Sequence, residues 1–186
     1  MLKIAFCGAH GTGKTTLVNR LASELNIHAM QRVTREAWEN FGVEDFEKIP
    51  LDARSVFQNY LLLNQIKKED LYKDQGFVTD RSVLDILCYT ELSSDMKGSS
   101  FDIFKHLVVE RLKNYNHLIY IPIEFEAQKE RLRANLDTRS DYDNILKKNL
   151  QELVGQSNFL VINGSVDERL VQIKEYLNQR SLIVYD

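Results

Sequence analysis

The sequence predicts an α/β fold, a parallel sheet flanked by helices, from three observations. Short apolar runs typical of buried strands alternate with helix-like segments along the whole chain. A glycine-rich stretch, GAHGTGKTT, joins the first apolar run to the first helix-like segment. No proline- or glycine-rich linker divides the 186 residues, so we expect a single domain over 1–186.

Five segments have the length and apolar character of strands. The first is the run KIAFC, and the second, IHAMQ, is the weakest of them. The third ends at the pair Asp80-Arg81, and the fourth is stopped by Pro122, which cannot donate to a neighbouring strand. The expected strands cover residues 3–7, 27–31, 76–79, 117–121 and 159–162.

The segments between these strands carry apolar residues at helical spacing. The first helix follows Thr15, and the longest covers residues 51–73. Ser82-Val83-Leu84-Asp85 has the form of a capping box, which would start a helix running through Leu92.

Further along the chain, MKGSS at 96–100 is expected to form a loop. The next helix is expected to share one apolar face among Phe104, Leu107, Val108, Leu112 and Tyr115. An arginine-rich helical stretch then precedes a helix near 141–154, and the final helix covers 166–178.

The glycine-rich stretch matches the complete P-loop pattern G-x-x-x-x-G-K-[ST]. Successive backbone N–H groups in such a loop bind phosphate oxygens, and glycines let the backbone approach closely. Lys14 can reach the β- and γ-phosphates, and the Thr15 hydroxyl can ligate Mg²⁺. The pattern therefore favours a P-loop NTPase fold with an ATP site over a plain turn. The predicted ATP-binding residues here are Gly8, His10, Gly11, Thr12, Gly13, Lys14, Thr15 and Thr16, with His10 interpreted as a spacer.

A charged pair, Asp80-Arg81, follows the third strand. Because ligands of open α/β sheets bind at the carboxyl ends of strands, Asp80 is expected on the same rim as the P-loop. Its carboxylate would bind Mg²⁺, directly or through water, or accept the proton of an attacking hydroxyl. Arg81 would hold a negative group of the acceptor. In the alternative reading, Asp80 caps the next helix and Arg81 pairs on the surface.

Two further basic clusters are candidates for binding charge. Arg32 and Arg35 share a face if QRVTREAW is helical, and we interpret them as acceptor ligands, with a solvated charged face as the alternative. Arginines in KERLRANLDTRSD would stabilise the charge of the transferred phosphoryl group on a segment that excludes water. Arg133 and Arg139 are the catalytic candidates there, whereas Arg131 fits a solvated helix.

The sequence lacks the patterns of two other P-loop classes. The fourth strand is followed by PIEFEAQKERLR, without the N-K-x-D type of pattern that reads guanine in GTPases. The third strand ends in GFVTDR, with a single carboxylate, whereas a motor or AAA-type ATPase usually has adjacent acidic residues there. These differences favour a kinase.

Five segments together resemble a family of small P-loop kinases: GAHGTGKTT, QRVTREAW, GFVTDRSVLDILCYT, IYIPIEFEAQKERLR and FLVINGSVDER. The family includes nicotinamide-riboside kinase domains and phage-type nucleotide kinases, and thymidylate kinases are more distantly similar. The resemblance covers nearly the whole chain. It implies a five-stranded parallel sheet and a helical lid at approximately 126–148, with Asp80, Arg81, Arg32 and Arg35 near the acceptor.

The resemblance also implies that the loop after the last strand packs against adenine. The residues at these positions are Asn163, Gly164, Ser165 and Val166. The chain departs from the family at the lid, where Asp137-Thr138-Arg139 replaces the Asp-Gly that often precedes the arginine.

The sequence thus predicts an ATP- and Mg²⁺-dependent kinase whose acceptor is a nucleoside or a (deoxy)nucleoside monophosphate. The surplus of basic residues slightly favours an acceptor that already carries a phosphate. Two alternatives stay open: a kinase acting on a polynucleotide or a modified DNA base, and an ATP-binding regulatory module without a small-molecule acceptor. A net charge of −3 weighs against a nucleic-acid partner.

Composition indicates the compartment. Cys7 and Cys88 have neither a disulfide framework nor metal-ligand spacing. The N-terminal MLKIAFCGAHG does not read as a signal peptide, and no segment approaches membrane-spanning length. We therefore expect a cytoplasmic protein with no membrane partner. The helix at 51–73 and the tail LIVYD suit a core or a homodimer equally.

Overall fold

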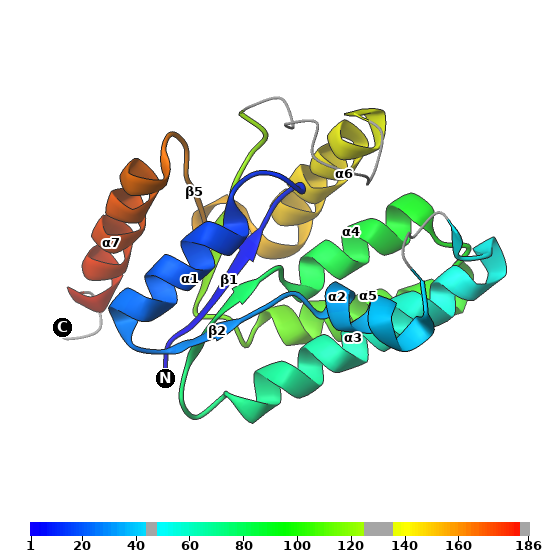
Figure 1. The fold of residues 1–186 in the computed structure, drawn as a ribbon. Helices are drawn as coiled ribbons and strands as arrows, with labels where there is room; N and C mark the ends of the chain where they lie inside the picture. The colour runs from blue at the N-terminus through cyan, green and yellow to red at the C-terminus, as the bar shows by residue number, and fades with distance from the viewer. Residues whose placement is uncertain (44–47, 125–135, 183–186) are drawn as a thin grey trace.

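The computed structural model describes residues 1–43, 48–124 and 136–182, and within them a parallel five-stranded sheet lies between two groups of helices (Figure 1). The strand order is β2-β3-β1-β4-β5, so the strand before the P-loop is central. The expected α/β fold is confirmed, including the weak second strand, which lies at one edge. The strands are β1 Lys3–Cys7, β2 His28–Met30, β3 Phe77–Asp80, β4 His117–Tyr120 and β5 Phe159–Val161.

The two faces of the sheet bury alternate side chains of each strand, because successive residues of a strand point to opposite sides. Ala5 and Cys7 belong to the core that packs against α2 to α6, whereas Ile4 and Phe6 belong to the core formed with α1 and α7. The helices are α1 Lys14–Leu25, α2 Val33–Phe41, α3 Leu51–Leu71, α4 Val83–Ser93, α5 Gly98–Leu112, α6 Leu136–Asn149 and α7 Val166–Leu182.

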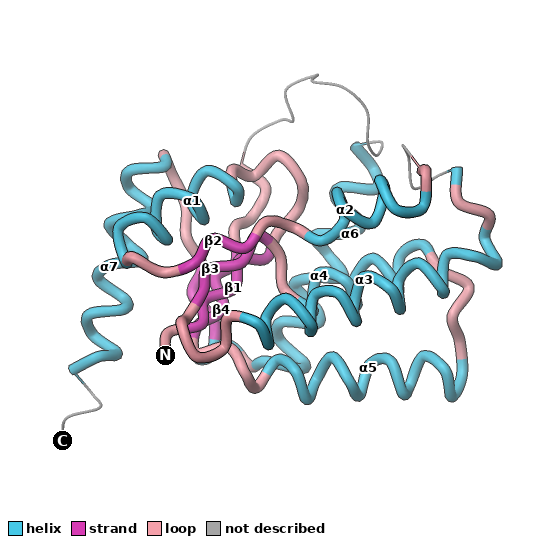
Figure 2. The backbone as a smooth tube through the Cα atoms, turned by 60° about the horizontal axis from the view of Figure 1, so that its bottom comes forward, coloured by secondary structure: helices cyan, strands magenta, loops and turns pink. Residues whose placement is uncertain are grey.

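The larger helical layer contains α3, α4 and α5 side by side (Figure 2). The capping box expected at Ser82 is present, since its hydroxyl accepts from the Asp85 N–H and the Asp85 carboxylate accepts from the Ser82 N–H. A π-helical turn, Leu150–Val154, extends α6 toward β5. None of the helices in the described part of the chain is long and apolar enough to cross a bilayer.

Two expectations about α5 were wrong. The helix begins at Gly98, inside the segment expected to be a loop. Its apolar residues do not share one buried face: Phe104 and Val108 are buried, but Leu107 is 46% exposed and Tyr115 lies beyond the end of the helix. The reason is that α5 is the outer helix of its layer and packs mainly on α4 and α3.

Parallel pairing brings the carboxyl ends of the strands to one edge. In the register of β1 with β3, Phe6 is paired with Asp80, so Asp80 lies next to the residues that open the P-loop. On the other side of β1, Cys7 is paired with Tyr120 of β4. The P-loop and Asp80, two features expected at the site from the sequence, therefore meet at this edge.

Candidate active site

The P-loop connects β1 to α1 and closes tightly against the end of β4. Gly8 has a φ of 146°, and a Cβ at this position would lie 2.5 Å from the carbonyl oxygen of Ile121. Only glycine fits such an approach between two backbone segments. The amino end of α1 completes the loop, so its N–H groups and partial positive charge face the same space.

The Lys14 ammonium lies inside this loop and is buried. Its Nζ donates to the carbonyl oxygens of Gly8 (2.8 Å) and Ala9 (2.5 Å) and to the Thr12 hydroxyl (3.1 Å). Burial, followed by the neighbouring Arg81, lowers the pKa of Lys14 from 10.5 to about 8. A negatively charged ligand in the loop would offset both effects, because it favours the charged ammonium.

Thr15 and Asp80 meet across the gap between α1 and β3. The Thr15 hydroxyl donates to a carboxylate oxygen of Asp80 at 2.5 Å, and Asp80 is 3% exposed. A hydroxyl and a carboxylate are oxygen ligands of the kind that Mg²⁺ takes, and this ion is usually held by one or two protein groups plus phosphates. The donor set therefore suits the metal expected from the sequence.

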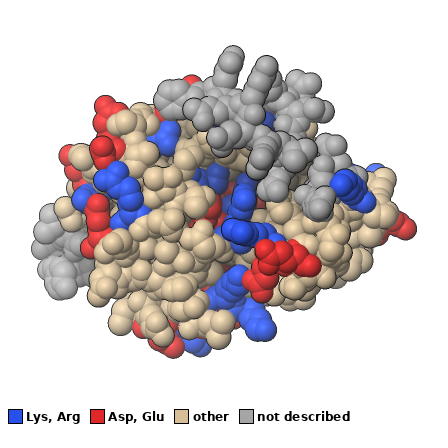
Figure 3. Space-filling model, viewed as in Figure 1, with Lys and Arg blue, Asp and Glu red and all other residues tan. Residues whose placement is uncertain are grey.

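Two adjoining cavities lie at this edge of the sheet. The first, of about 320 Å³, is lined by P-loop residues and by Arg32, Asp80 and Arg81, and it is named the donor cavity after the role that the sequence predicts for it. The second, of about 390 Å³, is lined by residues from α2, α3, α4 and α6, and it is named the acceptor cavity in the same way. His10, Arg32 and Arg81 line both cavities. Figure 3 shows Lys and Arg side chains gathered in the hollow at the middle of this face, with acidic side chains beside them.

The acceptor cavity combines aromatic walls with a buried amide. Trp38, Phe57 and Tyr89 supply the aromatic surface, and its volume is that of a pocket for one small molecule. Gln58 is 1% exposed, and its Oε1 accepts no hydrogen bond from any described residue. An orphaned acceptor in a cavity is costly unless a ligand donates to it. The sequence analysis missed Gln58, because one glutamine on an amphipathic helix carries no signal.

Arg81 is held in a strained conformation between the two cavities. It is a non-glycine residue with a φ of 90°, which costs about 1–3 kcal/mol and is typical of functional sites. Its N–H donates to the carbonyl oxygen of Phe6 (3.1 Å), and its own carbonyl accepts from the Thr79 hydroxyl (2.9 Å). Its guanidinium donates to Asp85 (3.2 Å) and to the Tyr89 hydroxyl (3.4 Å). These contacts hold the side chain at the boundary.

A buried carboxylate, that of Glu69, connects α3 to the segment that precedes Arg81. Glu69 of α3 is fully buried and accepts from Gln65 (2.8 Å), the Tyr115 hydroxyl (2.5 Å) and Arg111 (2.7 Å). Burial raises the pKa of Glu69, although its three donors act in the opposite direction. Gln65 also donates to Thr79, so the network reaches the segment that fixes Arg81.

The predicted basic residues are placed differently from one another. Arg32 lines both cavities, but the side chain of Arg35 is 82% exposed and pairs with Glu39 on its own helix at 3.7 Å. Arg35 lines neither cavity, as the solvated-face alternative describes. Arg32 precedes α2 and has a ψ of 137°, so the helical spacing that placed both arginines on one face does not apply.

Of the arginines expected in the lid, only Arg139 lies within the described residues. Arg139 of α6 is 4% exposed, and its Nε donates to the carbonyl oxygen of His10 at 3.1 Å, which brings it to the P-loop. Arg131 and Arg133 lie outside the described residues. His10 is more than a spacer in position, since it lines both cavities. Burial, followed by Arg139, lowers its pKa.

The loop expected to contact adenine lies at the end of β5. The N–H of Gly164 donates to the carboxylate of Glu124 at 3.0 Å, and Glu124 pairs with Arg169 at 2.8 Å. Arg169, which is 4% exposed, also donates to the carbonyl oxygen of Thr12 (2.7 Å). The loop 163–166 is therefore connected to the P-loop through two residues that the sequence analysis did not single out. A charged residue at a buried position of α7 was the available signal.

Comparison with known proteins gives one family and several similar folds. The family described as an AAA domain matches residues 3–169. No curated protein matches the chain. The similar solved structures below are NadR and nucleoside or nucleotide kinases, in agreement with the resemblance to small P-loop kinases found in the sequence.

Three solved structures illustrate the likeness. NadR in complex with NR has a TM-score of 0.73 and 18% identity, and the match covers 94% of this chain. This chain spans about half of NadR, 51% of its length. Deoxyadenosine kinase from M. mycoides with bound dATP has a TM-score of 0.70 and 16% identity, covering 96% of this chain and 100% of the other. Thymidylate kinase from Candida albicans has a TM-score of 0.68 and 11% identity, covering 97% and 92%. At these identities the likeness shows the fold alone.

Proposed function

The chain belongs to the AAA-domain family and has the P-loop fold of nucleoside and nucleotide kinases, and from this premise we propose that it transfers the γ-phosphoryl group of ATP to a nucleoside or (deoxy)nucleoside monophosphate. One observation carries the proposal: a phosphate-binding cavity adjoins a second, aromatic cavity, and His10, Arg32 and Arg81 line both. A transferase needs two such sites in contact, whereas hydrolysis alone needs only one.

On the donor side, the P-loop amides and Lys14 bind the phosphates of ATP. Lys14 would exchange its contacts with the carbonyls of Gly8 and Ala9 for phosphate oxygens. Thr15 and Asp80 would hold Mg²⁺, which supplies positive charge to the β- and γ-phosphate oxygens when bound. Arg139, together with Arg133, is assigned to the charge of the transferred group, and residues 163–166 to adenine.

On the acceptor side, the aromatic surface of Trp38, Phe57 and Tyr89 suits a planar base. The Oε1 of Gln58 would accept a hydrogen bond from an N–H group on that base, which would satisfy its buried lone pairs. Asp80, which lines the donor cavity beside Arg81, is assigned to orient the attacking hydroxyl or accept its proton.

The acceptor cavity keeps positive charge, since Arg32, Arg54 and Arg81 line it together with Asp85 and Asp141, so both a nucleoside and a monophosphate stay in the proposal. The sequence analysis slightly favoured a monophosphate, on the number of basic residues. Arg35 lies outside the cavity, however, and the guanidinium of Arg81 is already paired with Asp85. These two facts remove part of the positive charge that an acceptor phosphate would need.

The family description keeps a competing function open, an ATP-binding module that regulates a partner. The feature that speaks against it is the second cavity, with its orphaned glutamine oxygen, which a nucleotide switch does not require. The single carboxylate before Arg81 at the end of β3 is a second difference from an AAA-type ATPase.

An ADP-release screen tests the proposal. ATP and Mg²⁺ are offered with nucleosides, ribosides, monophosphates or DNA ends, and Lys14→Ala serves as the inactive control, expected to lose turnover by orders of magnitude with its fold intact. We expect one class of nucleoside or monophosphate to stimulate ADP release in the wild type alone. ATP binding without stimulation by any small molecule would refute the kinase assignment, and stimulation by DNA ends only would reassign the acceptor.

A further inference from the structure

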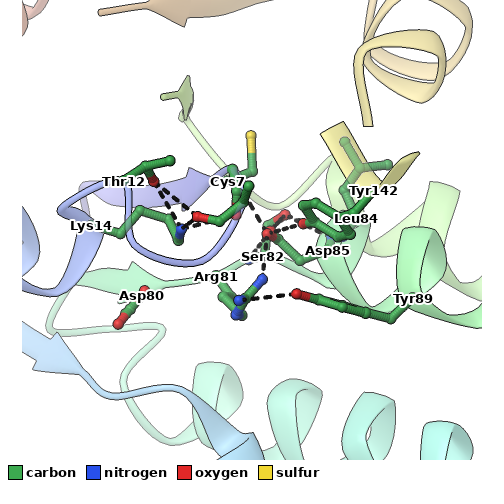
Figure 4. A network of polar contacts seen from close by, with 12 residues as sticks. Cys7, Thr12, Lys14, Asp80, Arg81, Ser82, Leu84, Asp85, Tyr89 and Tyr142 are labelled. Carbon is green, nitrogen blue, oxygen red and sulfur yellow. Dashed lines mark hydrogen bonds and ion pairs between the residues drawn. The ribbon is translucent and has the colours of Figure 1, made fainter. Parts of the chain in front are cut away.

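One carboxylate, that of Asp85, joins three parts of the site. Asp85 is fully buried near the start of α4 (Figure 4). Its Oδ1 accepts from the Gly8 N–H of the P-loop (3.3 Å), from Arg81 (3.2 Å) and from the Tyr142 hydroxyl of α6 (2.5 Å). Its Oδ2 serves the capping box of α4. The sequence indicated only this second role.

Tyr142 contributes its hydroxyl to this junction and its ring to the acceptor side. The side chain is 1% exposed, and its ring stacks on that of Tyr89, with centroids 4.4 Å apart and an interplanar angle of 29°. The Arg81 guanidinium carbon lies 5.9 Å from the Tyr142 ring centroid. Burial, and then the neighbouring Asp85, raise the pKa of Tyr142, so the hydroxyl keeps its proton and donates. Substitution by phenylalanine would remove only that hydroxyl.

Helix α6 contacts the P-loop at a second point. The Nε of Arg139 donates to the carbonyl oxygen of His10, one turn of helix before Tyr142. The first attachment runs from Tyr142 through Asp85 to the N–H of Gly8, so the two enclose the segment from Gly8 to His10, of which His10 lines the acceptor cavity. A shift of α6 would therefore pull on both ends of this segment.

We propose that Asp85 and Tyr142 are positioning residues that couple the docking of α6 to the shape of the P-loop and the placement of Arg81. The inference rests on the proposed function, because the loop must bind a nucleotide for the coupling to matter. Coupling of this kind is reciprocal: if docked α6 stabilises the donor-binding loop, the bound donor must stabilise docked α6 to the same extent. A role in folding alone would not produce this nucleotide dependence.

The chain offers a matched control for the Tyr142 hydroxyl. The Tyr120 hydroxyl donates to Asp143 of α6 at 2.8 Å, and both of these side chains are also buried. This bond likewise joins α6 to the sheet, but it involves neither Gly8 nor Arg81. Tyr142→Phe and Tyr120→Phe therefore each remove one buried hydroxyl bond of α6, and only the first touches the junction at Asp85.

The test measures binding of the non-hydrolysable analogue AMP-PNP with Mg²⁺ by calorimetry, and amide hydrogen exchange in α6 with and without it. We expect AMP-PNP to slow exchange in α6 of the wild type and of Tyr120→Phe, but not of Tyr142→Phe. We also expect Tyr142→Phe to raise the Kd about fivefold or more, and Tyr120→Phe to change it by less than about twofold. Both variants should lose similar amounts of thermal stability without nucleotide.

Equal effects of the two substitutions on the Kd, or no effect of either, would overturn the inference while leaving the kinase proposal intact. Unchanged exchange in α6 of the wild type on AMP-PNP binding would overturn it without any variant. If the wild type binds no AMP-PNP at all, the proposed function itself fails.

Discussion

The substitution Gly8→Ala isolates the close approach of the P-loop to the chain after β4. The new Cβ would lie 2.5 Å from the carbonyl oxygen of Ile121, and both segments are backbone, so neither can turn aside as a side chain does. Overpacking of this kind costs about 1–3 kcal/mol, and a φ of 146° adds a conformational cost of similar size. We expect the free energy of unfolding to fall by about 2–6 kcal/mol in total.

Gly11→Ala is the matched control in the same loop. Gly11 has a φ of 72°, and no heavy atom of the described residues lies within 4 Å of its Cβ position, so only a backbone cost of about 1 kcal/mol applies. In a chain of this size each kcal/mol corresponds to roughly 2–4 °C in Tm. Thermal unfolding without nucleotide should therefore show a several-fold larger decrease for Gly8→Ala. Equal decreases in the two variants would refute the reasoning.

Three further substitutions test the charged and polar groups of the site. Lys14 releases its proton near pH 8 when folded and near 10.5 when unfolded, so between these values the unfolded chain binds more protons and the free energy of unfolding rises with pH. Urea denaturation should show this rise, of up to about 3 kcal/mol, in the wild type and not in Lys14→Met. Glu69→Gln removes the buried carboxylate partner of Arg111, which keeps its pair with Asp70, and should lower the free energy of unfolding by about 1–3 kcal/mol, whereas Glu110→Gln, in an exposed pair, should leave the urea midpoint unchanged. Gln58→Met should raise the acceptor KM by about tenfold and change stability by less than about 1 kcal/mol, because its buried Oε1 has no described partner to lose. A rise in the KM for ATP instead would place Gln58 on the donor side.

The residues that the sequence located are those whose role depends on neighbours along the chain. The P-loop is a local motif between a strand and a helix, and the capping box at Ser82 lies within four residues. Apolar runs found each strand because burial on both faces of a parallel sheet selects such runs. Asp80 was placed on the correct rim because parallel strands bring their carboxyl ends together.

The residues that it missed or misplaced depend on contacts between distant segments. Asp85 was read as a helix cap, yet its other oxygen meets the hydroxyl of Tyr142, 57 residues along the chain. Arg35 carries the same charge as Arg32, but its side chain is exposed to solvent. The two differ because α2 begins at Val33, so Arg32 lies before the helix and Arg35 lies within it.

The amino-acid sequence alone thus determined the P-loop, the sheet and the rim on which the candidate site lies, because each follows from periodicity or from a short motif. Only the tertiary structure decided which buried polar groups meet. These groups are Gln58 in the acceptor cavity and the Asp85 carboxylate, which contacts the P-loop, Arg81 and α6 and offsets the charge of Arg81 beside the cavity. Such groups are selected by the cost of leaving a buried polar atom without a partner, and that partner is set by packing.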